Sequence, residues 1–183
     1  MLDEIVIAGF GGQGVLLMGR LIAYAGMLEG KNVAWMPSYG PEMRGGTANC
    51  TVIISSDEVA SPVIPNPMTL IAMNKPSLDK FESEVEKNGT IIINESLIPQ
   101  GAIRNDIKAF KIPANKIANE LGNLKVANMV VLGAYIAIRK SIKIETIFRA
   151  LEDTLGIKST KIVELNKKAI ERGEKIIIQK QYV

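Results

Sequence analysis

The segment Glu4-Ile-Val-Ile-Ala-Gly-Phe-Gly-Gly-Gln-Gly14 predicts a strand that runs directly into a glycine-rich turn. Residues 4–8 are short, apolar and β-branched, as in a buried parallel strand. Residues 15–28 follow with apolar side chains at helical spacing, and residues 32–36 form a second strand-like run that Pro37 is expected to end. Together these segments predict a β-α-β unit like the first one of a Rossmann fold.

Strand-like and helix-like segments continue to alternate along the chain. Further strands are predicted over 47–55, 69–73, 90–94 and 107–112, and helices over 76–86, 113–121, 126–139, 144–155 and 159–178. This order predicts one α/β domain over residues 1–183, built as an α/β/α sandwich in three layers. The sheet should be largely parallel, with a mixed sheet left open, and the last third should be helical. Small residues in 126–139 predict close approach of another backbone, namely Ala127, Gly133, Ala134 and Ala137.

The composition limits the chemistry that this chain can perform. Its 183 residues include no histidine and one cysteine, Cys50. An iron–sulfur cluster held by four cysteines, a Cys/His zinc site and a Ser-His-Asp triad are therefore excluded, and we expect no metal site. Cys50 lies in a predicted strand, where we expect a small buried side chain.

Charge and hydropathy limit the possible binding partners and the cellular location of the protein. The net charge of +3 is small and the basic residues are dispersed, so we expect no nucleic-acid partner. No apolar run reaches the roughly 18–20 residues that span a bilayer. The acidic start, without the basic region of a signal peptide, favours a cytoplasmic protein that has no membrane contact.

The glycine-rich turn is a candidate phosphate site. Gly9, Gly11 and Gly14 match G-x-G-x-x-G between a strand and a helix, where free N–H groups and the helix dipole attract an anion. A dinucleotide site would also need an acidic residue at the end of the second strand, and residues 32–36 supply none. The glycines therefore bind a phosphate of another ligand, or serve helix–strand packing or a subunit contact.

A second unusual loop, Ser38-Tyr-Gly-Pro-Glu-Met-Arg-Gly-Gly46, follows the second predicted strand. In an open parallel sheet it would lie at the same edge as the first glycine turn, where such sheets bind ligands. Arg44 could hold a phosphate or carboxylate through two hydrogen bonds. A pair between Glu42 and Arg44 that merely stiffens the loop is the alternative.

These two loops, their spacing and the strand over 47–55 resemble the gamma subunit of 2-oxoacid:ferredoxin oxidoreductases. The similarity extends from residue 4 to about residue 169. The second loop is most similar to the 2-oxoglutarate branch, and the pyruvate and 2-oxoisovalerate branches stay open. The resemblance implies CoA-dependent oxidative decarboxylation of a 2-oxoacid to acyl-CoA and CO2, with ferredoxin as electron acceptor. An independent Rossmann-type nucleotide-binding oxidoreductase is the alternative function.

The resemblance also implies how the work is divided within a complex. Thiamine diphosphate, Mg²⁺ and iron–sulfur clusters would lie in alpha, beta and delta partner subunits, so this chain alone should be inactive and supply no catalytic residue. Its role would be to position CoA, with the phosphate held by Gly9, Gly11, Gly12, Gln13, Gly14 and Arg44. Residues of the second loop would form a loop or subunit interface: Ser38, Tyr39, Gly40, Pro41, Glu42, Gly45 and Gly46. An exposed apolar or small-residue surface could let the isolated chain form a homodimer.

Overall fold

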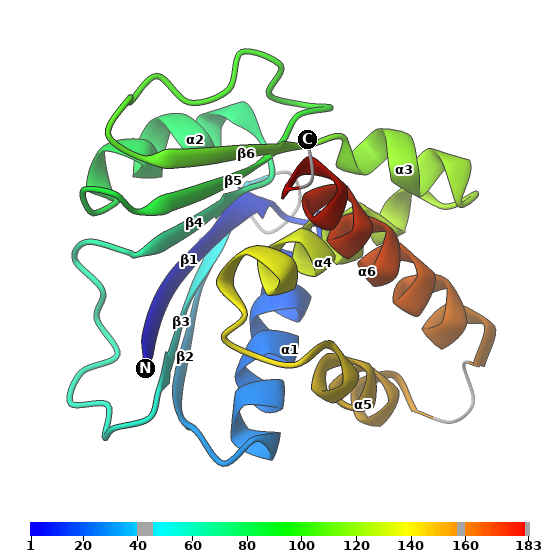
Figure 1. Ribbon diagram of the computed structural model, residues 1–183, viewed down its shortest axis with the longest axis horizontal. Helices are drawn as coiled ribbons and strands as arrows, with labels where there is room; N and C mark the ends of the chain where they lie inside the picture. The colour runs from blue at the N-terminus through cyan, green and yellow to red at the C-terminus, as the bar shows by residue number, and fades with distance from the viewer. Residues whose placement is uncertain (40–45, 157–159, 182–183) are drawn as a thin grey trace.

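The computed structural model describes residues 1–39, 46–156 and 160–181, and Figure 1 shows a twisted sheet with helices packed against it. The strands are β1 (Leu2–Phe10), β2 (Asn32–Tyr39), β3 (Thr47–Ser55), β4 (Thr69–Ala72), β5 (Thr90–Asn94) and β6 (Lys108–Ile112). The helices are α1 (Val15–Leu28), α2 (Lys75–Phe81), α3 (Ala114–Glu120), α4 (Ala127–Arg139), α5 (Ile144–Leu155) and α6 (Thr160–Gln181), with the short 3-10 turns η1 (Glu82–Glu84) and η2 (Leu124–Val126).

The sheet is mixed and has the strand order β2-β3-β1-β4-β5-β6. Strands β1, β4, β5 and β6 are parallel, whereas β3 runs antiparallel to both of its neighbours, β1 and β2. The predicted β-α-β unit is present, but β3 lies between its two strands, so it is not the adjacent pair of a Rossmann fold. The reason is the long antiparallel ladder of β3, which pairs with the whole of β1 from Leu2↔Ser55 to Phe10↔Thr47.

The prediction that Pro37 ends the second strand is wrong, because β2 continues through Pro37 to Tyr39. Strand β2 is one of the two edge strands of the sheet, and among the described residues it pairs with β3 alone. A proline is tolerated in an edge strand because its missing N–H can lie on the side that has no neighbour.

Helices cover both faces of the sheet, which confirms the three layers (Figure 1). Along β1 the side chains alternate between two cores, as expected for a strand. Ile5 and Ile7 face the larger core, formed with α1, α3, α4, α5 and α6. Val6 and Ala8 face a smaller core that includes Leu78 of α2. The predicted helical last third is also confirmed, and it belongs to the larger core.

The predicted close backbone approach at residues 126–139 is confirmed, and the partner is α6. A Cβ atom at Gly133 of α4 would lie 1.9 Å from the carbonyl oxygen of Ile170, and one at Gly173 of α6 would lie 1.8 Å from that of Val130. Among the described helices, none combines the length and apolar character that crossing a membrane requires.

A buried carboxylate fixes α4 against the sheet. Asp3 of β1 accepts hydrogen bonds from the Tyr135 hydroxyl at 2.9 Å and from the Thr69 hydroxyl at 3.2 Å, and Arg139 pairs with it at 3.0 Å. Burial raises the pKa of Tyr135 well above its usual value, so its hydroxyl keeps the proton that it donates. This network satisfies a buried charge and holds the last turns of α4 at the start of β1.

Candidate ligand-binding site

The glycine turn joins the end of β1 to the start of α1, and each glycine has its own role. Gly12 and Gly14 have φ angles of +93° and +72°, which glycine adopts without the steric cost of a side chain. Gly9 is buried, and a Cβ atom there would lie 2.7 Å from Val15 Cγ2, so Gly9 serves close packing. Of the predicted binding residues, Gly9 therefore serves packing, whereas Gly12 and Gly14 allow the backbone conformation of the turn.

The glycine turn contacts Gly46, the last residue of the second glycine-rich segment, at one edge of the sheet. The N–H of Gly11 donates to the carbonyl oxygen of Gly46 at 2.9 Å, and the N–H of Gln13 donates to that of Phe10 at 3.1 Å. These two N–H groups are therefore engaged within the protein. Within the described part of the chain, the N–H groups of Gly12 and Gly14 have no backbone acceptor, so they are the turn's available donors.

The side chain of Gln13 points into the turn and not toward solvent. Its Oε1 atom accepts a hydrogen bond from the Phe10 N–H at 2.7 Å and another from Asn74 Nδ2 at 2.9 Å. Asn74 also caps α2 by accepting from the Ser77 N–H at 3.0 Å. Gln13 thus holds the turn in shape and links it to the neighbouring strand β4.

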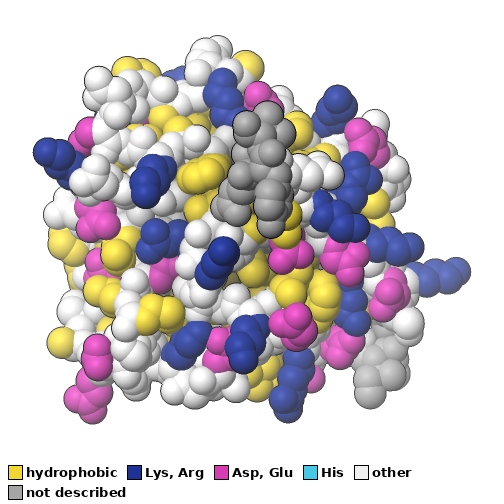
Figure 2. Space-filling view, viewed as in Figure 1, with side chains coloured by type: hydrophobic (Ala, Val, Ile, Leu, Met, Phe, Trp, Pro, Cys, Tyr) yellow, Lys and Arg dark blue, Asp and Glu magenta, His cyan; other side chains and the backbone are white. Residues whose placement is uncertain are grey.

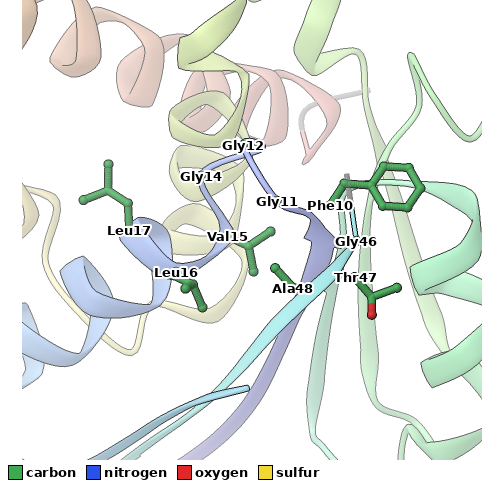
Figure 3. Close-up of a pocket in the computed structure, with 10 residues that line it drawn as sticks. All are labelled: Phe10, Gly11, Gly12, Gly14, Val15, Leu16, Leu17, Gly46, Thr47 and Ala48. Carbon is green, nitrogen blue, oxygen red and sulfur yellow. The ribbon is translucent and has the colours of Figure 1, made fainter. Parts of the chain in front are cut away.

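A cavity of about 300 Å³ opens between the glycine turn, the start of α1 and the start of β3. Figure 3 shows Val15 pointing toward Ala48 across it, while the ring of Phe10 points to the opposite side. The described lining residues are Phe10, Gly11, Gly12, Gly14, Val15, Leu16, Leu17, Gly46, Thr47 and Ala48. None of these described residues is charged, so the part of the cavity that they form suits a neutral, largely apolar group, and the volume lies at the lower end for small-molecule sites.

A second cavity of about 170 Å³ lies beside the first, and Gly12 lines both. Its remaining lining residues are Gln13, Met73, Asn115, Leu124, Lys125, Ala127 and Asn128. Asn128 Nδ2 donates to the Gly14 carbonyl oxygen at 3.2 Å, and Asn94 Nδ2 donates to Asn115 Oδ1 at 2.9 Å. Among the described lining residues of the two cavities, Lys125 is the one charged residue and none is acidic.

The sequence did not point to these asparagines as site residues. They come from separate segments of the chain, and only the folded sheet brings them together. A signal does exist, since β4 is followed by Met73-Asn74 and β5 ends at Asn94, which places polar amides at the carboxyl ends of buried parallel strands. That edge is where open α/β sheets bind ligands.

Residues of the second predicted loop are only partly described. Ser38 and Tyr39 end β2, with Ser38 exposed and opposite Asn49 of β3. Gly46 touches the glycine turn through the hydrogen bond to Gly11. Gly40, Pro41, Glu42, Arg44 and Gly45 lie outside the described residues.

Cys50 is fully buried, as predicted, and its Sγ lies 3.7 Å from the Val15 carbonyl oxygen. Burial raises the pKa of the Cys50 thiol to about 12, so it stays a neutral thiol. Among residues 1–39, 46–156 and 160–181, no group of three or more His, Cys, Asp or Glu side chains could hold a metal ion.

A mixed sheet covered by helices on both faces, with a glycine turn and adjoining cavities at its edge, places the protein in the doubly covered α/β class. The chain belongs to the pyruvate ferredoxin/flavodoxin oxidoreductase family, whose family model matches residues 4–176.

Two relatives illustrate the range of chain lengths in the family. The chain is 41% identical over 171 residues to ketoisovalerate oxidoreductase subunit VorA of Methanothermobacter marburgensis, covering 93% of this chain and 35% of that subunit. It is 32% identical over 188 residues to 2-oxoglutarate synthase subunit KorC of the same organism, covering 99% of this chain and 100% of that subunit. This chain thus spans about a third of the VorA relatives and the full length of that KorC.

Solved structures confirm the fold. The gamma subunit of a keto/oxoacid ferredoxin oxidoreductase from Geobacter sulfurreducens PCA matches with a TM-score of 0.82 and 28% identity, covering 97% of this chain and 99% of that one. A 2-oxoglutarate:ferredoxin oxidoreductase from Magnetococcus marinus, solved with 2-oxoglutarate, coenzyme A and succinyl-CoA bound, matches with a TM-score of 0.88 over 97% of this chain and 31% of that one. At 23% identity, the second match shows the fold alone.

Proposed function

We propose that residues 1–183 form a single gamma-type domain of a 2-oxoacid:ferredoxin oxidoreductase, which holds CoA for a reaction that partner subunits perform. Family membership and the full-length match to KorC support the subunit role. The observation that carries the CoA assignment is the glycine turn itself, where the N–H groups of Gly12 and Gly14 have no backbone acceptor among the described residues. The cavities beside these glycines have no acidic side chain among their described lining residues.

The glycine turn and the cavity beside it match two parts of CoA, the diphosphate and the pantetheine arm. Its diphosphate would bind at Gly12 and Gly14, where free N–H groups and the N-terminal end of α1 attract an anion. The neutral cavity next to Val15 and Ala48 would hold part of the pantetheine arm and keep water from it. Arg44 of the second loop would add a contact to the phosphate, and the loop residues from Ser38 to Gly46 would meet a partner subunit.

In the assembled complex, a 2-oxoacid and CoA would become acyl-CoA and CO2 while electrons pass to ferredoxin. We assign thiamine diphosphate, Mg²⁺ and iron–sulfur clusters to the alpha, beta and delta partners, because this chain has one cysteine and no histidine to hold a cluster. Thiamine diphosphate would supply the decarboxylation, and this chain would bind and orient CoA. We therefore propose that the isolated chain is inactive and works in the cytoplasm with its partners.

The relatives leave the 2-oxoacid open among three branches. The second loop favours 2-oxoglutarate, and the KorC relatives also match this chain in length. The VorA relatives match with higher identity, which favours 2-oxoisovalerate. Initial rates of the assembled complex with 2-oxoglutarate, 2-oxoisovalerate and pyruvate at equal concentration would assign the branch.

The alternative, an independent dinucleotide-dependent oxidoreductase, fits the structure less well. A Rossmann site uses the crevice beside two adjacent parallel strands and an acidic residue at the end of the second. Here β3 separates β1 from β2, and β2 carries no acidic residue. Titration of the chain with NAD and FAD should therefore give no binding.

Replacing Gly12 tests the CoA site directly. A Cβ atom at Gly12 would meet nothing within 4 Å, so a side chain there fills the open space that a phosphate needs. We expect Gly12→Val to weaken CoA binding by at least about tenfold, which corresponds to about 1.4 kcal/mol. Calorimetric titration of CoA into the chain, alone and assembled with its partners, measures the change.

Gly30→Val is the matched control for this experiment. Gly30 has a φ of +73°, a Cβ atom there would also meet nothing within 4 Å, and the residue lies beyond the other end of α1. The substitution should cost similar stability and leave CoA affinity unchanged. Equal CoA affinity in Gly12→Val, Arg44→Ala and the wild type would mean that the glycine turn is purely structural.

A further inference from the structure

The smaller cavity beside Gly12 is lined by hydrogen-bond donors that a ligand can reach. Gly12 is exposed, and its N–H has no backbone acceptor within the described part of the chain. Lys125 is also exposed, and its ammonium group forms neither a hydrogen bond nor an ion pair with any described residue. Both groups can therefore donate to a ligand in the cavity without breaking a bond inside the protein.

Asn115 adds a third donor to the same cavity. Its Oδ1 accepts from Asn94 Nδ2 at 2.9 Å, and Asn94 Nδ2 also donates to the Met73 carbonyl oxygen at 3.5 Å. These bonds fix the orientation of both amides, because a flipped Asn94 would set its oxygen against that carbonyl. The Nδ2 atom of Asn115 therefore has no partner among the described residues, and it belongs to a partly exposed side chain that lines the cavity.

Size and charge together favour a phosphate group as the occupant. The cavity volume of about 170 Å³ is below the 300–1,000 Å³ of sites that enclose a whole ligand, so it suits one group of a larger molecule. The donors come from the glycine turn, α3 and η2, and none of the described lining residues is acidic. A phosphate presents several acceptor oxygens to separate donors, and a lysine ammonium strengthens such hydrogen bonds by its charge.

We infer that this cavity binds the 3′-phosphate of CoA, held by Lys125 and Asn115. The inference rests on the proposed function, which assigns the diphosphate of CoA to Gly12 and Gly14. The 3′-phosphate and the diphosphate are carried by the same ribose, so their two sites must adjoin. Gly12 lines both cavities, which places the second phosphate site next to the first. Lys125 is thus a specificity-determining residue for CoA.

The first test needs no substitution in the protein. CoA and 3′-dephospho-CoA are titrated calorimetrically into the wild-type chain, alone and assembled with its partners. The second ligand lacks the group that the cavity would hold, so it should bind at least about tenfold more weakly. Equal affinity for the two ligands would overturn the 3′-phosphate assignment and leave the CoA site in place. No binding of CoA in either form of the protein would remove the proposed function itself.

The second test asks whether Lys125 causes the discrimination. In Lys125→Ala, CoA should bind more weakly and its advantage over 3′-dephospho-CoA should fall below about twofold. Lys116→Ala is the matched control, because Lys116 is also an exposed lysine of this region but lines neither cavity. An advantage that survives Lys125→Ala, or that Lys116→Ala also abolishes, would overturn the role of Lys125.

A third variant places a negative charge in the cavity without changing the size of a side chain. The carboxylate of Asn115→Asp can still accept from Asn94 Nδ2, so the contact between α3 and β5 is kept. It should repel the 3′-phosphate and weaken CoA binding at least about tenfold, while the affinity for 3′-dephospho-CoA changes less than about threefold. An equal loss for both ligands, or no loss for CoA, would contradict a phosphate at Asn115.

Discussion

Gly12 and Gly14 differ in what surrounds them, although both have positive φ angles. A Cβ atom at Gly12 would enter open space, whereas one at Gly14 would lie 2.2 Å from Asn128 Nδ2. The sequence motif marks both positions equally. Only the fold shows that Gly12 borders open space and that Gly14 lies against the side-chain amide of Asn128 in α4.

The reactivity of the Cys50 thiol tests whether this side chain is buried in the core of the folded protein. Because burial raises the pKa of its thiol to about 12, the native protein should expose almost no thiolate at pH 8. We expect a thiol-specific reagent to label Cys50 only at the rate at which the protein unfolds, and immediately in denaturant. Rapid labelling of the folded chain at pH 8, followed by absorbance, would contradict the buried position.

At the level of elements, the local sequence pattern predicted most strands and helices correctly. It did not predict features that depend on which strands pair with each other in the sheet. The boundaries of α1, β3, β5 and α5 agree with the prediction, because each has a clear apolar period or a β-branched run. The prediction that Pro37 ends a strand was wrong because a proline interrupts a central strand but is tolerated in an edge strand such as β2. The position of β3 between β1 and β2 is set by cross-strand packing, which no local pattern contains.

The packing of α4 against α6 gives a prediction about stability. A Cβ atom at Gly133 would overlap the backbone of Ile170, which cannot move without shifting the helix. We expect Gly133→Ala to lower the free energy of unfolding by about 3 kcal/mol, measured by urea denaturation. Gly26→Ala in α1 is the control, since its Cβ would lie 2.9 Å from the Val33 side chain and not 1.9 Å from a helix backbone atom, so it should cost clearly less. An equal or smaller loss for Gly133→Ala would contradict the helix contact.

At the scale of the whole molecule, exposed apolar residues lie near the edge of the sheet that β2 forms. Met27 of α1 is 62% exposed, and Trp35 and Met36 of the edge strand β2 are 38% and 40% exposed. Strand β2 has no charged residue that would oppose pairing of its open edge. On the face shown in Figure 2, basic and acidic side chains are intermixed, unlike the one-sign stripe that nucleic-acid binders present.

We therefore expect the isolated chain to self-associate through β2, the strand edge that a partner would otherwise cover. Met36→Lys adds a charge to this edge and should shift sedimentation toward the monomer. Ile103→Lys changes a residue that is 84% exposed and lies in the segment before β6, so it should leave the association unchanged. A monomeric wild type at high concentration would contradict self-association.

One direct measurement tests whether this chain and its proposed partner subunits perform different parts of the reaction. The chain alone, its partner subunits alone and the reconstituted mixture are each supplied with a 2-oxoacid, CoA and a redox dye, and dye reduction is followed. We predict CoA-dependent reduction only in the mixture, because we propose that this chain positions CoA while the partners hold the groups that transfer electrons. Reduction by the chain alone, or an unchanged rate from the partners without it, would contradict this account.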